Sequence, residues 1–450
     1  MALVAPNIIT SVRAAGGIRP PPSGRVVVGV IGWGMQGPPN TGNLMNLADC
    51  QVVAACDLHQ GRRERAVNEI NRHYGNTDCK AYTDYREMMA RPDIDAVMIA
   101  VPDHWHALMA IEAAKNGKDI YGEKPLARTI AEQQAIVKAV QANQRIWQTG
   151  SWQRSDRNFH YAAEIVRNGL IGKVTRVEVG LPSGHNDFPG TGRTLLAKLR
   201  QLPNPPRSLA EVVPGTPAWE ASVSEAPADY DTWLGPSRME PYIEARIYQN
   251  WRWNYNTGGG QLMDWIGHHC DIAHWGLGDD DKIGPSEVEG EGEFPPPNAI
   301  WNTCTRYRIT AKYPNEVTMI IAGGHRDISQ GTKWIGTEGW VWVNRGGFDC
   351  SIAELQNSWS LPEEKRKVKL INTASRSGHQ RNFIDSVKSR QPTVAPVEVA
   401  HHSAIPGHLG LIAMLVKRKI KWDAAKEEIT GDAEASKLLS RPYREPWKLG

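Results

Sequence analysis

The sequence predicts a two-domain α/β protein, in which a doubly wound parallel sheet precedes an α+β domain with a large, mostly antiparallel open sheet. Short apolar runs alternate with helical segments up to residue 150. Beyond residue 280, strand patterns follow one another with turns between them. The length of 450 residues also favours two domains.

The composition is that of an ordinary globular protein. A net charge of +3 is too small to indicate nucleic acid or a membrane surface as a partner. No stretch reaches the ~18–20 apolar residues expected of a membrane span. The six cysteines are scattered and indicate neither a zinc site nor a disulfide framework. Seventeen tryptophans provide flat faces that suit sugar rings, although most are expected in the core.

The first strand is expected from Val26, where β-branched residues lead into a G-x-G-x-x-G motif. The first glycine permits a tight turn, the second lets the backbone approach phosphates, and the third lets the following helix pack closely. The N–H groups of the first helical turn then face an anion. The motif therefore predicts a dinucleotide site, with contacts from Gly32, Gly34, Met35, Gln36 and Gly37.

Asp57 ends the second expected strand, twenty residues after the last glycine of the motif. Its carboxylate can accept hydrogen bonds from ribose hydroxyls and would repel a 2′-phosphate, which favours NAD over NADP. Arg62 and Arg63 weaken this preference, because a guanidinium could accommodate the phosphate.

The rest of the first domain alternates helices and strands. Helices are expected at 61–74, 85–90, 102–116 and 131–142, and strands at 95–101, 119–122 and 145–150. Ligands bind at the carboxyl ends of such strands. Residues that follow these ends, and are therefore expected near the cofactor, are Pro102, His104, His106, Glu123 and Lys124.

The second domain is expected to begin at residue 151, with a helix from 159 and a strand from 174. Residues 183–250 are rich in proline, glycine and tryptophan, which is typical of a binding lid or an oligomer arm. Further strands are expected at 288–294, 304–313, 317–322 and 334–343, and helices at 380–388 and 408–415. We expect the tail, residues 422–447, to fold back over the first domain. An open sheet face needs covering, so a homodimer or homotetramer is predicted.

A second motif runs from Gly258 to Asp271 and reads as a loop that enters a helix. Asp264 and His268 are four residues apart and share a helix face. A histidine beside a carboxylate at the mouth of a nucleotide cleft is a candidate proton acceptor. These residues could also chelate a metal, but no H-E-x-x-H arrangement is present and no metal is expected.

Together these stretches resemble the Gfo/Idh/MocA family, which includes glucose–fructose oxidoreductase and inositol dehydrogenases. The family motifs match at the three glycines, at Glu123-Lys124-Pro125, and at residues 258–271 as G-G-G-x-L-x-D-x-x-x-H-x-x-D. The resemblance covers residues 26 to 450. It implies a Rossmann domain at 26–150, an open-sheet domain at 151–450, NAD(P), and a sugar or polyol substrate.

The resemblance also implies catalytic roles for Lys124, Asp264 and His268. Lys124 would hydrogen-bond the reacting hydroxyl and stabilise developing alkoxide. His268 would be the general base, oriented by Asp264. Residues expected on the substrate side, besides these three, are Trp152, Gln153, Arg154, Tyr255 and His269.

The leading hypothesis is an NAD-dependent oxidoreductase that acts on a ring hydroxyl of a sugar or glycoside, with carbon 3 expected. The alternative is an NAD-dependent glycosidase that works by transient oxidation, elimination, hydration and reduction. That reaction needs a further base near carbon 2, for which His269 or Tyr255 could serve. A cofactor-loaded sugar-binding protein without turnover is a third possibility, disfavoured by the intact Lys124 and His268.

The 183–250 insertion and the N-terminal arm, residues 1–25, are similar to family members exported to the periplasm through a twin-arginine leader. This similarity implies export and a cofactor held tightly in the folded protein. No twin arginine is present in residues 1–25, so a cytoplasmic location is the alternative.

Overall fold

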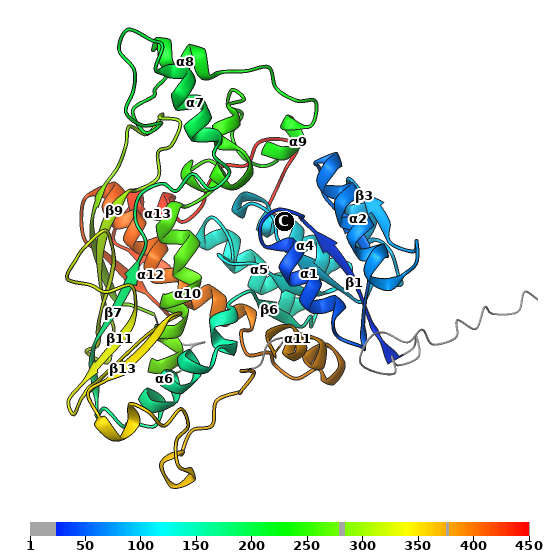
Figure 1. Ribbon diagram of the computed structural model, residues 1–450. Helices are drawn as coiled ribbons and strands as arrows, with labels where there is room; N and C mark the ends of the chain where they lie inside the picture. The colour runs from blue at the N-terminus through cyan, green and yellow to red at the C-terminus, as the bar shows by residue number, and fades with distance from the viewer. Residues whose placement is uncertain (1–23, 279–283, 375–377, 450) are drawn as a thin grey trace, which may run out of the picture.

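The computed structural model describes residues 24–278, 284–374 and 378–449, so the expected N-terminal arm lies almost wholly outside them. Two sheets are separated by a layer of helices (Figure 1). One sheet has six strands and the other nine. The predicted fold class is confirmed, since the first sheet is parallel and the second is mostly antiparallel.

The first sheet has the order β3-β2-β1-β4-β5-β6. The chain order reverses between β1 and β4, which is where such sheets open a crevice for ligands. The three-residue strand β3 was not predicted, because it is too short to show a period. The strands are β1 (Val26–Ile31), β2 (Cys50–Cys56), β3 (Lys80–Tyr82), β4 (Ala96–Ile99), β5 (Asp119–Gly122) and β6 (Trp147–Thr149).

Helices flank this sheet and have well-defined ends. Asp84 and Thr129 cap helix N-termini by accepting hydrogen bonds from backbone N–H groups. Gly75 ends a helix in the left-handed conformation, with a φ of 67°. The helices are α1 (Gly37–Met45), α2 (Gln60–Tyr74), α3 (Tyr85–Met89), α4 (His106–Lys115) and α5 (Ile130–Ala142).

The second sheet has the order β13-β12-β11-β7-β10-β9-β8-β14-β15. Within this sheet, as far as the described residues form it, only β7 and β10 pair in parallel. The stretch predicted at 334–343 is divided by a turn into β11 and β12. The strands are β7 (Val174–Leu181), β8 (Glu287–Glu293), β9 (Arg306–Lys312), β10 (Thr318–Gly323), β11 (Gly331–Gly336), β12 (Trp340–Asn344), β13 (Gly347–Cys350), β14 (Ile420–Asp423) and β15 (Glu428–Thr430).

Helices α6 (Arg157–Arg167), α10 (Gly260–Leu277) and α12 (Val397–Val416) cover the inner face of this sheet (Figure 1). Helix α13 (Ala433–Lys437) lies at its edge beside β15, whereas α11 (Gly378–Ser389) packs against α1 and β1 of the first domain. The buried ring of Trp334 fixes α10 on the sheet, because its indole N–H donates to the Ala273 carbonyl at 3.1 Å.

Helix α12 begins well before the predicted start at residue 408. By length and composition it is apolar enough to cross a membrane, contrary to the expectation that no stretch of the sequence would be. However, 83% of its most apolar window is buried inside the protein. Packing against α5 and α10 accounts for this apolar character.

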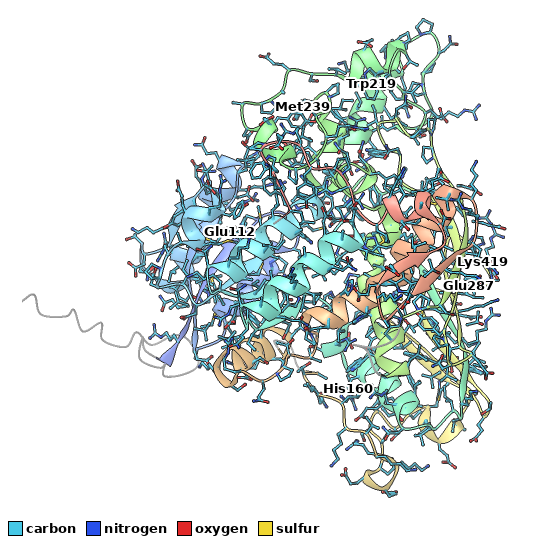
Figure 2. All side chains as sticks on the ribbon, turned by 180° about the vertical axis from the view of Figure 1, so that it is seen from behind. Glu112, His160, Trp219, Met239, Glu287 and Lys419 are labelled. Carbon is cyan, nitrogen blue, oxygen red and sulfur yellow. The ribbon has the colours of Figure 1, made fainter. Side chains whose placement is uncertain are left out.

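The outer face of the nine-stranded sheet carries polar side chains. Along β9, Tyr307, Ile309 and Ala311 face the core and alternate with more exposed residues. Glu287 and Lys419 lie together at the outer edge, with an ion pair of 2.8 Å (Figure 2). The oligomeric state remains a prediction.

The 183–250 insertion is not irregular. It contains α7 (Thr191–Leu199), α8 (Pro217–Ser222) and α9 (Tyr230–Leu234). Trp219 and other insertion residues form a small core together with Trp253, Ile300 and Trp301 of the second domain. Figure 1 shows it as a green lobe above both sheets. Part of the tail, which was expected to fold back over the first domain from residue 422, instead forms β14 and β15 of the nine-stranded sheet. Its end lies against the first domain, where the ring centroids of Trp447 and Trp105 are 4.9 Å apart.

Candidate active site

A cavity of about 920 Å³ lies where the carboxyl edge of the first sheet, the insertion and α10 meet. This volume is in the range of small-molecule and cofactor sites. Of the residues expected to bind the cofactor, those that line it are Gly32, Gly34, Met35, Gln36, Asp57, Pro102, Glu123 and Lys124.

The glycine motif has the shape of a dinucleotide cradle. Gly32 has a φ of +90°, and a Cβ there would lie 2.2 Å from the Ala100 carbonyl oxygen. A Cβ on Gly37 would lie 1.9 Å from the Gly32 carbonyl oxygen, so this glycine lets α1 pack against the turn. At Gly34 a Cβ would meet only the Arg62 side chain, at 3.6 Å. Gly34 therefore leaves room for a ligand to approach the backbone, and the residues present fit NAD.

Asp57 lines the cavity at the end of β2. One carboxylate oxygen accepts the Trp33 N–H at 2.7 Å and the other accepts the His59 N–H at 2.9 Å. A carboxylate oxygen has two lone pairs, so both retain capacity for a ribose hydroxyl. Arg63 donates to the Asp57 and Leu58 carbonyls. Only Arg62 of the two arginines lines the cavity.

Aromatic residues of the insertion line this half of the cavity and are called its roof below. Arg62 lies over the Tyr248 ring, 5.2 Å from its centroid. Trp447 of the tail reaches the same cavity. These aromatic residues were not among the predicted site residues, and the only signal for them was the aromatic content of the insertion. The roof is made of Tyr230, Trp233, Tyr242 and Tyr248.

Lys124, Asp264 and Arg252 form a buried charge cluster. Lys124 Nζ donates to Asp264 Oδ1 at 2.9 Å and to its carbonyl oxygen at 2.8 Å. Arg252 Nε donates to the same Oδ1 at 3.0 Å. Gly267 lets α10 approach, since a Cβ there would lie 2.9 Å from the Lys124 Cβ. An ammonium has three N–H donors, so one remains for a ligand.

The electrostatics keep Asp264 ionised. Burial raises the pKa of its carboxyl, but Arg252 and Lys124 outweigh this and hold the pKa well below its usual range. Glu123, beside Lys124, accepts a hydrogen bond from Asn40 at 2.8 Å. Burial raises the pKa of the Glu123 carboxyl.

His268 lies one helical turn beyond Asp264 on α10 and also lines the cavity. Its Nδ1 is buried and has no hydrogen-bond partner among the described residues. The Trp265 ring lies 5.4 Å from the imidazole. Burial and the nearby charges of Lys124 and Arg345 lower the pKa of His268 well below 6.5. The imidazole is therefore neutral at neutral pH and can accept a proton.

His104 and His106 were expected at the cofactor but are not among the described residues that line the cavity. The ring nitrogens of His104 lie 2.9 Å from the Trp233 carbonyl and 3.3 Å from that of Thr257. Those of His106 lie 2.7 Å from the Pro125 carbonyl and 2.9 Å from that of Val101. Both rings contact backbone carbonyls and so hold the segment after β4 against the neighbouring backbone.

Of the residues expected on the substrate side, some line the cavity and others do not. Trp152 lines the cavity. Arg154 is buried and binds both carboxylate oxygens of Asp271, at 2.8 and 2.9 Å. This pair holds α10 against the segment after β6 and is not part of the lining of the cavity.

Gln153, Tyr255 and His269 also lie outside the described lining residues. Gln153 Nε2 donates to the His268 carbonyl at 3.3 Å and lies 3.3 Å from His269 Nδ1. The Tyr255 hydroxyl accepts the Cys304 N–H at 3.1 Å. These residues therefore do not reach the described cavity, and Gln153 instead hydrogen-bonds to the helix that carries the lining residue His268.

Two arginines of the site were not predicted. Arg252 stands between Trp251 and Trp253, just before the triple glycine, and this proximity was the available signal. Arg345 lies on the turn between β12 and β13 and lines the cavity near His268. No motif marks it, because only the folded sheet brings this turn to α10.

Comparisons with known proteins agree with this architecture. Residues 26–151 match the family model described as "Oxidoreductase family, NAD-binding Rossmann fold", and residues 215–449 match "Oxidoreductase family, C-terminal alpha/beta domain". The first domain is thus an NAD-binding Rossmann fold.

Similar sequences include an inositol 2-dehydrogenase of Salmonella paratyphi B, 32% identical over 151 residues, which are 33% of this chain and 44% of that protein. An alpha-N-acetylgalactosaminidase of Shewanella oneidensis is 30% identical over 195 residues, 39% of this chain and 42% of that protein. The chain therefore spans less than half the length of these curated relatives.

Among solved structures, a scyllo-inositol dehydrogenase from Lactobacillus casei with bound NAD(H) and scyllo-inositol aligns with a TM-score of 0.55 at 15% identity. The alignment covers 89% of this chain and 99% of that one. At this identity the likeness concerns the fold.

Proposed function

Because the chain belongs to the Gfo/Idh/MocA oxidoreductase family, we propose that it is an NAD-dependent oxidoreductase acting on a ring hydroxyl of a sugar or glycoside, with carbon 3 the expected position. The observation that carries this proposal is that His268, whose buried Nδ1 has no hydrogen-bond partner among the described residues, lines one cavity with Lys124 and the glycine cradle. A proton acceptor, a cationic donor and a dinucleotide site are the parts that alcohol oxidation needs.

Bound NAD supplies the hydride acceptor. Lys124 donates its remaining N–H to the reacting hydroxyl and stabilises negative charge on that oxygen. Neutral His268 takes the hydroxyl proton. Asp264 and Arg252 fix the Lys124 ammonium in place, and the closely approaching helix α10 keeps the base at a constant distance from it.

The roof supports tight retention of the cofactor. Tyr248 and Trp233 of the insertion line the cavity on the side of the insertion, opposite the glycine turn and Asp57. Contact with these aromatic rings would slow the release of a cofactor bound in the cavity. Tight retention is what an exported enzyme would require, and export remains part of the proposal.

The glycosidase alternative is favoured by the similarity to an alpha-N-acetylgalactosaminidase. Elimination would need a second base near carbon 2. His269 and Tyr255, the two residues considered for it, both lie behind the described wall of the cavity. The dehydrogenase is therefore the better-supported of the two reactions.

The test is to incubate the protein with p-nitrophenyl glycosides, monosaccharides and inositols, with and without added NAD. Absorbance at 340 nm and nitrophenol release are followed together. NADH formation without nitrophenol supports the dehydrogenase, whereas nitrophenol without net NADH supports the glycosidase. The absence of both signals across the panel would refute the proposal. Lys124→Ala should abolish turnover but retain the cofactor.

A further inference from the structure

The turn between β12 and β13 places one cation at the substrate end of the cavity. Arg345 lines the cavity together with His268, Lys124 and Trp265. Its guanidinium carbon lies 4.4 Å from the centre of the Trp265 ring and 4.8 Å from that of Trp152. Contact with two indole faces holds the guanidinium plane in a narrow range of orientations.

Hydrogen bonds fix the base of this side chain. Arg345 Nε donates to Gln153 Oε1 at 3.0 Å, and the Arg345 backbone N–H donates to Asn344 Oδ1 at 2.7 Å. Gln153 in turn donates to the His268 carbonyl. The position of Arg345 is thereby linked to the helix that carries the base.

The outer end of the guanidinium is unsatisfied by the protein. No described hydrogen bond uses its two terminal nitrogens, and no carboxylate of the described residues lies within 4.0 Å of them. At this end of the cavity Lys124 and Arg252 share the carboxylate of Asp264, and Glu123 lies beside Lys124. Among the described residues, Arg345 is the cation there with no carboxylate at ion-pair distance.

Resting on the proposed sugar oxidation, we propose that Arg345 binds a carboxylate of the substrate, so that the preferred substrates are sugar acids or their glycosides. Two coplanar N–H groups match the two oxygens of a carboxylate. The flanking tryptophan faces suit a pyranose ring and a planar acid group. A bound carboxylate would also neutralise one of the cations that line the cavity with His268.

The test compares matched pairs of neutral sugars and sugar acids: glucose with glucuronate, galactose with galacturonate, and their methyl glycosides. Glucose 6-phosphate is included to test whether a phosphate can replace the carboxylate. Steady-state oxidation gives kcat/KM, and calorimetric titration of the cofactor-loaded protein gives Kd. The acids should bind and react at least tenfold better than the neutral sugars and better than the phosphate.

Arg345→Gln should reduce kcat/KM for the acids by roughly 10- to 100-fold, mainly through KM, the factor expected for a charge-assisted hydrogen bond. Neutral sugars should lose a much smaller factor, and Arg345→Lys should lie between. Arg326→Gln, on the loop after β10 and outside the described cavity lining, is the matched control.

If neutral sugars are oxidised without preference for the acids, or if Arg345→Gln affects both classes equally, the carboxylate inference is wrong and the oxidoreductase proposal stands. If nothing is oxidised, the oxidoreductase proposal is wrong. Calorimetry then still decides about Arg345, because equal affinity for glucuronate and glucose would overturn its assignment.

Discussion

The shared counter-charge of Lys124 and Arg252 can be removed by the substitution Asp264→Asn, which preserves side-chain shape. Oδ1 of Asp264 accepts from Lys124 at 2.9 Å and from Arg252 at 3.0 Å. The side chains of Lys124, Arg252 and Asp264 are 11%, 11% and 15% exposed, so water screens these charges little. An asparagine would leave two buried cations without an anion.

Breaking a buried ion pair by removing one partner costs about 3–5 kcal/mol, because the remaining charge stays desolvated. We expect a loss of this size in the free energy of unfolding, measured by urea denaturation with tryptophan fluorescence. Asp327→Asn is the control, since Asp327 forms a similarly short ion pair with Arg308 at the surface, at 2.7 Å, and should change the midpoint little.

The pH dependence provides a second measure. Asp264 has a folded-state pKa below its ordinary value of 3.8, so its ionisation stabilises the protein above that pH, and the stabilisation is lost as the pH falls below it. The asparagine variant should lack this part of the acid dependence. A destabilisation below about 1 kcal/mol would show that the cluster is well hydrated and would refute the reasoning.

Three further predictions concern catalysis and cofactor retention. His268→Gln should reduce kcat by about 10²- to 10⁴-fold with partial rescue by imidazole, and full activity would exclude His268 as the base. Since burial lowers the pKa of His268 well below 6.5, protonation of this residue should not reduce kcat/KM between pH 8 and 6.5; a loss of activity centred at 6.5 would contradict its environment. Tyr248→Ala should release NAD faster during desalting than Met239→Ala, an exposed change in the same insertion (Figure 2), and equal retention would argue against the roof.

The first domain could be predicted well from the sequence because its strands are buried on both faces and its helices have caps. Gly32, Asp57 and Lys124 lie at strand ends, where the fold alone determines proximity to the cleft. The helices of the insertion were missed because each is short, and α7 and α8 pack on a local core that has no sequence period.

Side-chain direction at the site was harder to predict. His104 follows the end of β4, as expected, but its ring turns towards the Trp233 carbonyl. Arg154 has the polarity of a ligand residue, yet Asp271 of α10 pairs with it. Arg345 depends on a contact with Gln153, which is distant in the chain. Such partners are decided by tertiary packing, which local patterns do not encode.

The proposed proton transfer and the proposed substrate selection depend on different kinds of segment in this cavity. Lys124 and His268 belong to a strand end and a helix that the core holds rigidly, whereas Arg345 belongs to a hairpin turn. Turns tolerate substitution and changes of length more readily than packed elements do. Relatives could therefore differ in substrate preference through changes in the hairpin turn, while Lys124 and His268 stay the same. Exchanging this turn would likewise be a way to change the substrate preference of this chain.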